Sequence, residues 1–160
     1  MTWQAKAKDI KKLQIEITNY CQARCPECAR EKIFMNGIDE STPYVFEINN
    51  LYVNKDTFVS WLSKDDWSSL QLIDICGNYD EPCTNPEILD IVEWIVTSDL
   101  FNKDLQVNIA TNGGVRDTKF WTDLGKLTEA HRNTKGGPRI RVVWGIDGLE
   151  DTNHLYRRNV

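Results

Sequence analysis

The chain has 160 residues, of which 41% are apolar and 27% charged, a composition that suits one ordinary globular domain. Its 19 basic and 24 acidic residues give a formal net charge of −5, which argues against a nucleic-acid backbone as the main partner. No apolar run could cross a bilayer, no secretory signal is visible, and five cysteines, an odd number, suit a reducing interior. We therefore expect a single cytoplasmic domain over residues 1–160, with no membrane partner.

Four runs of residues predict β-strands, at 13–18, 70–76, 105–110 and 140–144. In the first run apolar and polar residues alternate, which is the period of a strand. The first interval between strands is the longest, and we expect residues 34–53 within it to form an inserted loop.

Helical patterns lie between these strands. Residues 87–98 carry an i, i+3, i+4, i+7 apolar face, with Asn85 as the expected N-cap and Pro86 at the first helical position. Residues 118–130 show the same spacing, and a third helix is expected from about Asn54. Strands that alternate with helices in this way predict parallel strands with right-handed crossovers.

The segments that follow the strands are the first place to look for function, because parallel α/β folds bind ligands beyond the carboxyl ends of their strands. In chain order these segments read TNYCQARCPEC, GNYDEP, TNGG and GIDG. Each is polar, glycine-rich or able to bind a metal.

Three cysteines, Cys21, Cys25 and Cys28, lie on one such segment in the spacing C-x3-C-x2-C and could converge on one metal centre. A zinc site would want a fourth ligand, and a fully thiolate-bound cubane cluster would want a fourth cysteine. The other candidates lack a partner at paired ligand spacing: Cys76, Cys83, His131 and His154. From the spacing alone, a catalytic iron–sulfur cluster, a zinc site and core cysteines all stay open.

The preceding strand, the spacing and the sequence CQARCPECAR resemble the radical S-adenosylmethionine (radical SAM) family. Three further stretches agree in order and placement. GNYDEP at 77–82 looks like the family's Gly-Gly-Glu-Pro motif, IATNG at 109–113 like its third-strand ending, and WGIDGLEDTNHLYRR at 144–158 like its fourth strand and following helix. The resemblance covers nearly the whole chain, and the four stretches together are specific.

The resemblance implies an α/β fold, a partial (βα) barrel of the radical SAM type with about four parallel strands and flanking helices. It also implies two cofactors, a [4Fe-4S] cluster and S-adenosyl-L-methionine (SAM). Cys21, Cys25 and Cys28 would ligate three irons, and the amino and carboxylate groups of SAM would chelate the fourth.

The same resemblance implies the contacts to SAM. Glu81 and the backbone around Tyr79 and Asp80 would receive its ammonium group, and Asn112 and Asp147 would lie near its ribose or carboxylate. Each of these stretches also has a structural explanation, because DEP suits a helix-entry turn, TNGG a loop turn and IDG a strand exit.

The implied activity is reductive cleavage of SAM to a 5′-deoxyadenosyl radical that abstracts hydrogen from a peptide, a nucleoside or a small metabolite. A reductant such as flavodoxin or ferredoxin would be a partner. The alternative is a non-catalytic iron–sulfur or zinc-binding protein, a truncated relative without SAM turnover. The family core has six strands and four are expected here, so we expect truncation after the fourth βα unit and self-association through an open edge.

The chain departs from the family pattern at three positions. Glu27 stands before the third cysteine, where an aromatic residue is common. Asp80 replaces the second glycine of the Gly-Gly-Glu-Pro motif, and Gly145 replaces a common serine. These departures put the details of SAM affinity in question more than the cluster.

Other residues near the motifs have weaker assignments. Arg24, Arg30 and Lys32 flank the cysteine loop and could raise the reduction potential of a cluster, although a solvated basic face explains them equally well. Cys76 is expected in the core at a strand end, and Cys83 is expected to bind no metal.

Overall fold

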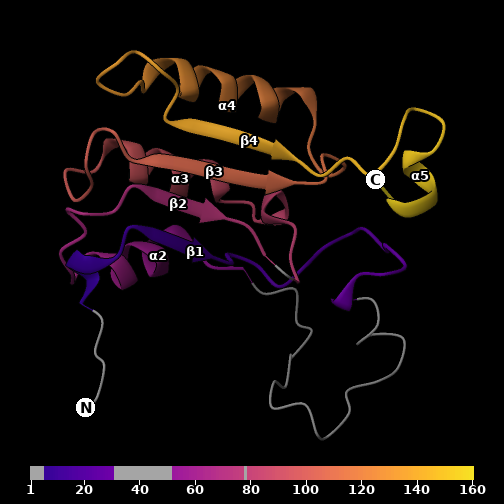
Figure 1. The fold of residues 1–160 in the computed structure, drawn as a ribbon, viewed down its shortest axis with the longest axis horizontal. Helices are drawn as coiled ribbons and strands as arrows, with labels where there is room; N and C mark the ends of the chain where they lie inside the picture. The colour runs from indigo at the N-terminus through magenta and orange to yellow at the C-terminus, as the bar shows by residue number, and fades with distance from the viewer. Residues whose placement is uncertain (1–5, 31–51, 78) are drawn as a thin grey trace, which may run out of the picture.

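The computed structural model describes residues 6–30, 52–77 and 79–160 (Figure 1). In this part of the chain one parallel sheet has the strand order β1-β2-β3-β4, and each strand pairs with the next along the chain. Its strands are β1 (Lys12–Ile15), β2 (Leu72–Ile75), β3 (Gln106–Thr111) and β4 (Ile140–Trp144). The predicted α/β class with about four parallel strands is confirmed.

The first strand ends earlier than the sequence pattern predicts. Beyond Ile15 the chain leaves β2, and its next partners come from the residues before the first long helix. The carbonyl of Ile17 accepts a hydrogen bond from the backbone N–H of Val53 at 2.8 Å, and Thr18 forms an antiparallel bridge with Tyr52. Apart from residues 52 and 53, the expected inserted loop lies outside the described residues.

Helices connect the strands where the periodicity predicts them, as α2 (Lys55–Leu62), α3 (Ile88–Thr97) and α4 (Thr118–Ala130). The short α5 (Asn153–Tyr156) follows β4, where the resemblance implies a helix. Two 3-10 turns complete the described elements, η1 (Ala7–Asp9) and η2 (Pro82–Thr84). Asn54 caps α2 by accepting from Thr57 N–H at 2.8 Å, and Asp117 caps α4 through Phe120 N–H at 2.9 Å. No helix in the described ranges has the length and apolar character needed to span a membrane.

Asn85 is not the N-cap of α3, and that prediction was wrong. The helix begins at Ile88, with Glu87 at the N-cap position. The Asn85 side chain is buried, and its Nδ2 donates to the carbonyls of Ile17 and Val53, both at 2.9 Å, while its Oδ1 accepts from Glu87 N–H at 2.9 Å. It therefore fixes the turn after β2 against the segment that follows β1.

One face of the sheet is buried under the helices. Alternate residues of the strands pack against the apolar faces of α2, α3 and α4 and form the core with them. The core includes Ile73, Ile75, Val107, Ile109, Phe58, Ile88, Ile91, Val92, Ile95, Phe120 and Leu124. In Figure 1, α2 and α3 lie behind the strands and α4 runs alongside β4. This burial is the main stabilising contribution to the fold.

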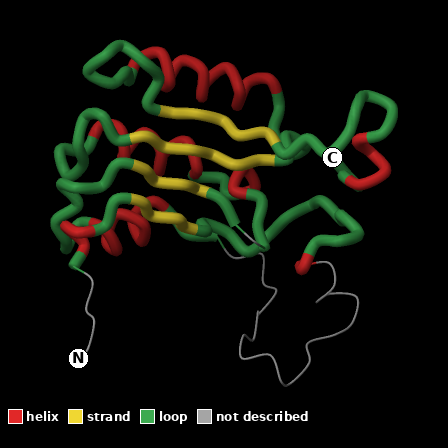
Figure 2. The backbone as a smooth tube through the Cα atoms, in the orientation of Figure 1, coloured by secondary structure: helices red, strands yellow, loops and turns green. Residues whose placement is uncertain are grey.

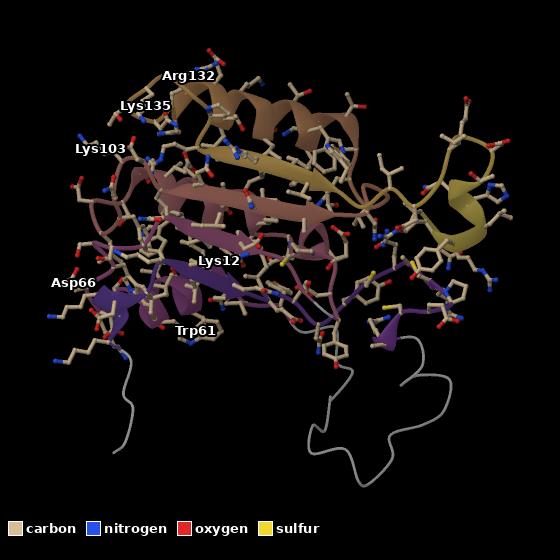
Figure 3. All side chains as sticks on the ribbon, viewed as in Figure 1. Lys12, Trp61, Asp66, Lys103, Arg132 and Lys135 are labelled. Carbon is tan, nitrogen blue, oxygen red and sulfur yellow. The ribbon has the colours of Figure 1, made fainter. Side chains whose placement is uncertain are left out.

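The opposite face of the sheet is polar and partly exposed. A row of residues in register crosses it from β1 to β4, namely Gln14, Asp74, Asn108 and Arg141. Lys12, labelled in Figure 3, forms an ion pair with Asp74 at 2.9 Å on this face.

Cys76 is half-buried rather than part of the core, so that prediction was wrong. Since Ile73 and Ile75 point into the core, the alternation of the chain sends Cys76 toward the polar face. Burial, and then the negative charges of Asp74 and Asp80, raise the pKa of its thiol.

Candidate functional site

The segments that follow the four strands meet in one cavity of about 350 Å³. Figure 2 shows the loops and α5 gathered beyond the carboxyl ends of the strands. All eight residues proposed from the sequence line this cavity: Cys21, Cys25, Cys28, Tyr79, Asp80, Glu81, Asn112 and Asp147. The described structure thus brings together the whole candidate set, although the residues come from four separate parts of the chain.

The cysteine loop forms one wall of the cavity. Cys25 is buried, while Cys21 and Cys28 are half-buried, and Cys28 N–H donates to the carbonyl of Cys25 at 3.0 Å. Burial is the largest cause that raises the pKa of the Cys21 thiol to about 11, and the positive charge of Arg30 opposes it. Among the described residues, no three Cys, His, Asp or Glu side chains lie close enough to hold one metal ion.

Backbone hydrogen bonds fix the cysteine loop against two of the other segments. The N–H of Glu81 donates to the carbonyl of Tyr20 at 2.9 Å, just before the first cysteine. The N–H of Arg24 donates to the carbonyl of Arg158 at 3.0 Å. The loop after β2 and the chain after α5 therefore hold the cysteine loop at separate points.

Glu81 is 3% exposed, and its carboxylate accepts three hydrogen bonds. The hydroxyl of Thr111 donates to Oε1 at 2.6 Å, and the N–H of Cys83 donates to the same oxygen at 3.1 Å. The N–H of Asn112 donates to Oε2 at 2.7 Å. Since a carboxylate offers about four lone-pair positions, most of the acceptor capacity of Glu81 is used to join η2 to the end of β3.

Asp80 lies beside Glu81 in a different environment. Neither carboxylate oxygen forms a hydrogen bond within the described chain, and both are shielded from solvent. Burial, and then the negative charge of Glu16, raise the pKa of Asp80 to about 7. The N–H groups of Thr18 and Ile17 lower it by a smaller amount without reaching hydrogen-bond geometry.

Glycine at position 77 makes room for the Asp80 side chain. A β-carbon on Gly77 would lie 1.9 Å from Asp80 Oδ1 and 2.9 Å from Glu16 Oε2. The two carboxyl groups therefore approach the same point in front of Gly77. The negative charge of Glu16 so close to the shielded Asp80 oxygens is the second cause, after burial, of the raised pKa of Asp80.

Asn112 connects the end of β3 to the cysteine loop. Its Oδ1 accepts from the Gln22 amide at 2.8 Å, and its Nδ2 lies 3.8 Å from the Cys21 sulfur, within donor distance for sulfur. The Asn112 side chain therefore lines the cavity and is engaged with the cysteine loop.

Asp147 is engaged in a similar way at the end of β4. It forms an ion pair with Arg157, whose Nη1 lies 3.9 Å from the Cys25 sulfur as a donor. Gly145 leaves room for this guanidinium, since a β-carbon there would lie 2.8 Å from Nη2. The chain after α5 therefore brings a positive charge to the middle cysteine.

Cys83 is fully buried in the core and does not line the cavity, and burial raises the pKa of its thiol to about 12. Arg30 lines the cavity, whereas Arg24 is exposed and Lys32 lies outside the described residues.

Two residues that sequence reasoning passed over belong to the cavity, Thr111 and Arg157. Thr111 lies inside the quoted stretch IATNG, so the strand-end argument could have found it. Arg157 lies 132 positions from Cys25 and meets it only because the chain turns back after β4. No spacing rule predicts that contact.

The chemistry of the cavity fits the cofactors that the resemblance implies. Three thiols from one loop can ligate an iron–sulfur cluster, and in a cubane cluster each thiolate binds a different iron rather than one shared ion. Asp80, whose oxygens accept no hydrogen bond from the described residues, could receive an ammonium, and Arg30 and Arg157 could place positive charges beside a cluster or a carboxylate.

Comparison with known proteins gives no further assignment, because no family model, no curated protein and no solved structure matches the chain.

Proposed function

We propose that the chain is a radical SAM iron–sulfur protein with a partial (βα) barrel, acting on a substrate that is still unidentified. The observation that carries the proposal is the convergence of Cys21, Cys25 and Cys28 with the segments after β2, β3 and β4 in one cavity. A metal held only for structure could be bound by the cysteine loop alone. A cluster that also binds SAM would need further side chains, and the segments after β2, β3 and β4 could supply them.

The three cysteines would hold three irons of a [4Fe-4S] cluster, with the fourth left to the amino and carboxylate groups of SAM. When bound and reduced, this pair of cofactors supplies a 5′-deoxyadenosyl radical that abstracts a hydrogen atom. The task of the chain is to orient SAM, to exclude water and to hold the cysteine loop in place.

The contacts of the two neighbouring carboxyl groups favour Asp80 over Glu81 as the group that meets the SAM ammonium. Glu81 already accepts three hydrogen bonds from its own chain, and Asp80 accepts none within the described residues. A ligand cation next to Asp80 would offset the repulsion from Glu16 and stabilise the ionised form. Since both Asp80 oxygens are shielded, the side chain must turn toward the cavity to make this contact.

The backbone at Tyr79 would support the ammonium end, and Asn112 and Asp147 would act near the ribose or carboxylate by positioning Gln22, Cys21 and Arg157. We place the protein in the cytoplasm, because all five cysteines are free thiols. The cluster would then take its electron from a reductant such as flavodoxin or ferredoxin.

Anaerobic reconstitution tests the proposal. Iron and acid-labile sulfide should bind to the wild-type chain and be lost in Cys21→Ala, Cys25→Ala and Cys28→Ala. The matched controls are Cys76→Ala and Cys83→Ala, which should keep the cluster per folded molecule because neither thiol lines the cavity. Stoichiometric zinc without sulfide would reject the cluster and favour the zinc-binding alternative.

A product assay separates the enzyme from a non-catalytic relative. The reconstituted chain is incubated with SAM and dithionite, and 5′-deoxyadenosine is measured. Its formation in wild type, and its loss in Cys25→Ala, is the expected result. A fully loaded cluster that forms no 5′-deoxyadenosine would favour the alternative, a non-catalytic iron–sulfur protein.

A further inference from the structure

Arg157, which directly follows α5, is held by three contacts. Its Nε donates to Asp147, its Nη1 points to the Cys25 sulfur at 3.9 Å, and its guanidinium lies 5.8 Å from the Tyr156 ring centre. Three-quarters of the side chain is buried. The guanidinium is therefore held in place and directed at the middle cysteine rather than at solvent.

The surrounding backbone leaves space for this arrangement. A β-carbon on Gly145 would lie 2.8 Å from Nη2 and 3.2 Å from the central guanidinium carbon. The Arg158 carbonyl meanwhile accepts from Arg24 N–H, which joins this end of the chain to the cysteine loop one residue before Cys25. Gly145 and the Arg24–Arg158 backbone hydrogen bond thus both favour the contact between Arg157 and Cys25.

We propose that Arg157 is a positioning residue that stabilises negative charge on the Cys25 side of the cavity and so raises the reduction potential of the bound cluster. This inference rests on the proposed function. Three thiolates bring three negative charges into a partly buried cavity, and reduction adds one electron from a low-potential donor without a compensating proton. A fixed positive charge beside a ligating sulfur favours the reduced form.

Asp147 gives the inference a sign that can be tested. Its carboxylate neutralises part of the Arg157 charge, so the pair acts on Cys25 as a partly compensated cation. Removing the arginine charge should make the cluster harder to reduce. Removing the aspartate charge should leave the guanidinium less compensated and make the cluster easier to reduce.

The experiment is a redox titration of the reconstituted chain without SAM, with dithionite as the reductant and the iron content measured in parallel. Arg157→Gln should lower the equilibrium constant for one-electron reduction about tenfold, which corresponds to about 59 mV. Arg157→Lys, which keeps the charge, should recover at least half of this shift. Arg158→Gln removes the same formal charge from an exposed neighbouring side chain and should leave the potential at the wild-type value.

Asp147→Asn should shift the potential in the opposite direction from Arg157→Gln. A purely structural role, in which either change loosens the chain after β4, would move both variants in the same direction and would overturn the inference. An unchanged potential in Arg157→Gln with a full cluster would overturn it too. If Arg157→Gln assembles no cluster, the potentials of Asp147→Asn and Arg157→Lys test the inference. A lowered potential in Asp147→Asn would contradict the proposed charge effect. A wild-type chain without any cluster would instead reject the proposed function.

Discussion

The hydroxyl of Thr111 donates a 2.6 Å hydrogen bond to the carboxylate of Glu81 and joins the end of β3 to the turn after β2. The same hydroxyl accepts from the N–H of Gly113 at 3.0 Å. Both residues are buried, so this contact operates away from water, where an unpaired carboxylate oxygen is costly. It makes Glu81 part of the framework that holds the cavity.

Thr111→Val should therefore destabilise the fold without removing any candidate ligand. Valine keeps the shape of threonine but leaves Glu81 with one donor fewer, and hydrogen bonds to charged groups contribute about 1.5–3 kcal/mol. Urea unfolding of the metal-free chain measures the loss. Thr122→Val is the matched control, because its hydroxyl is exposed on α4 and its replacement should change stability by less than about 0.5 kcal/mol. Equal stabilities of the two variants would show that the Glu81 contact contributes little.

Asp80 should make the metal-free protein less stable as the pH rises from about 4 to 7. Burial and Glu16 raise its folded pKa to about 7 from an ordinary 3.8, so in this window the folded chain binds more protons than the unfolded chain. The contribution of a protonated Asp80 is complete below the unfolded pKa and is lost as the pH passes through the folded one. After allowance for partial exposure, the expected loss is on the order of 1–2 kcal/mol.

Urea unfolding between pH 5 and 8 measures this slope in wild type and in Asp80→Asn. The charges of Glu16 and Glu81 act on Asp80, and the Cys76 thiol, which senses the Asp80 charge, also senses Asp74, Lys12 and Glu16. Asparagine cannot ionise, so the variant should lose most of the slope and exceed wild type in stability at pH 8. Identical slopes in the two proteins would assign the pH dependence to one of the neighbouring groups instead.

Sequence reasoning predicted the layout of the site well because that layout depends on local patterns. Apolar periodicity predicted the strands and the helices α2, α3 and α4, and parallel topology then placed the strand ends together. The error at Cys76 was local, because the alternation from the buried Ile73 and Ile75 puts Cys76 on the opposite face. The error at Asn85 came from a long-range contact, since its amide meets the carbonyl of Ile17 across 68 positions. Which atoms meet inside the cavity depends on such contacts, so the partners of Glu81, Asp80 and Arg157 could not be predicted.

The chain should self-associate through the open edge of β4 and the apolar segment that follows this strand. Turnover of SAM by the chain alone should be weak. β4 pairs only with β3 in the described sheet, and the segment after it carries exposed apolar side chains at Ile146, Leu149 and Leu155. Such edges and patches favour association with another copy. Sedimentation velocity over a range of concentrations should show a dimer or larger species. Ile146→Lys should shift the chain toward monomer, since Ile146 is 69% exposed.

Trp61→Lys is the control for this association. Trp61 is 49% exposed on α2, away from β4, and its replacement should not change the sedimentation (Figure 3). A wild-type chain that remains monomeric and forms 5′-deoxyadenosine rapidly would show that the strands described here are sufficient.

Asp80→Asn should weaken SAM binding to the reconstituted chain more than Glu81→Gln does in its folded fraction. A charge-assisted hydrogen bond is worth about 1.5–3 kcal/mol, so its loss should weaken binding roughly ten- to a hundredfold. Glu81→Gln should mainly lower stability, because a glutamine amide cannot accept from Thr111, Cys83 and Asn112 as the carboxylate does. Calorimetric titration of SAM, with the iron content and unfolding free energy of each variant, separates the two effects. If neither change weakens binding while the cluster stays intact, the match of YDEP to the family motif is accidental, and the case for SAM rests on the cysteines alone.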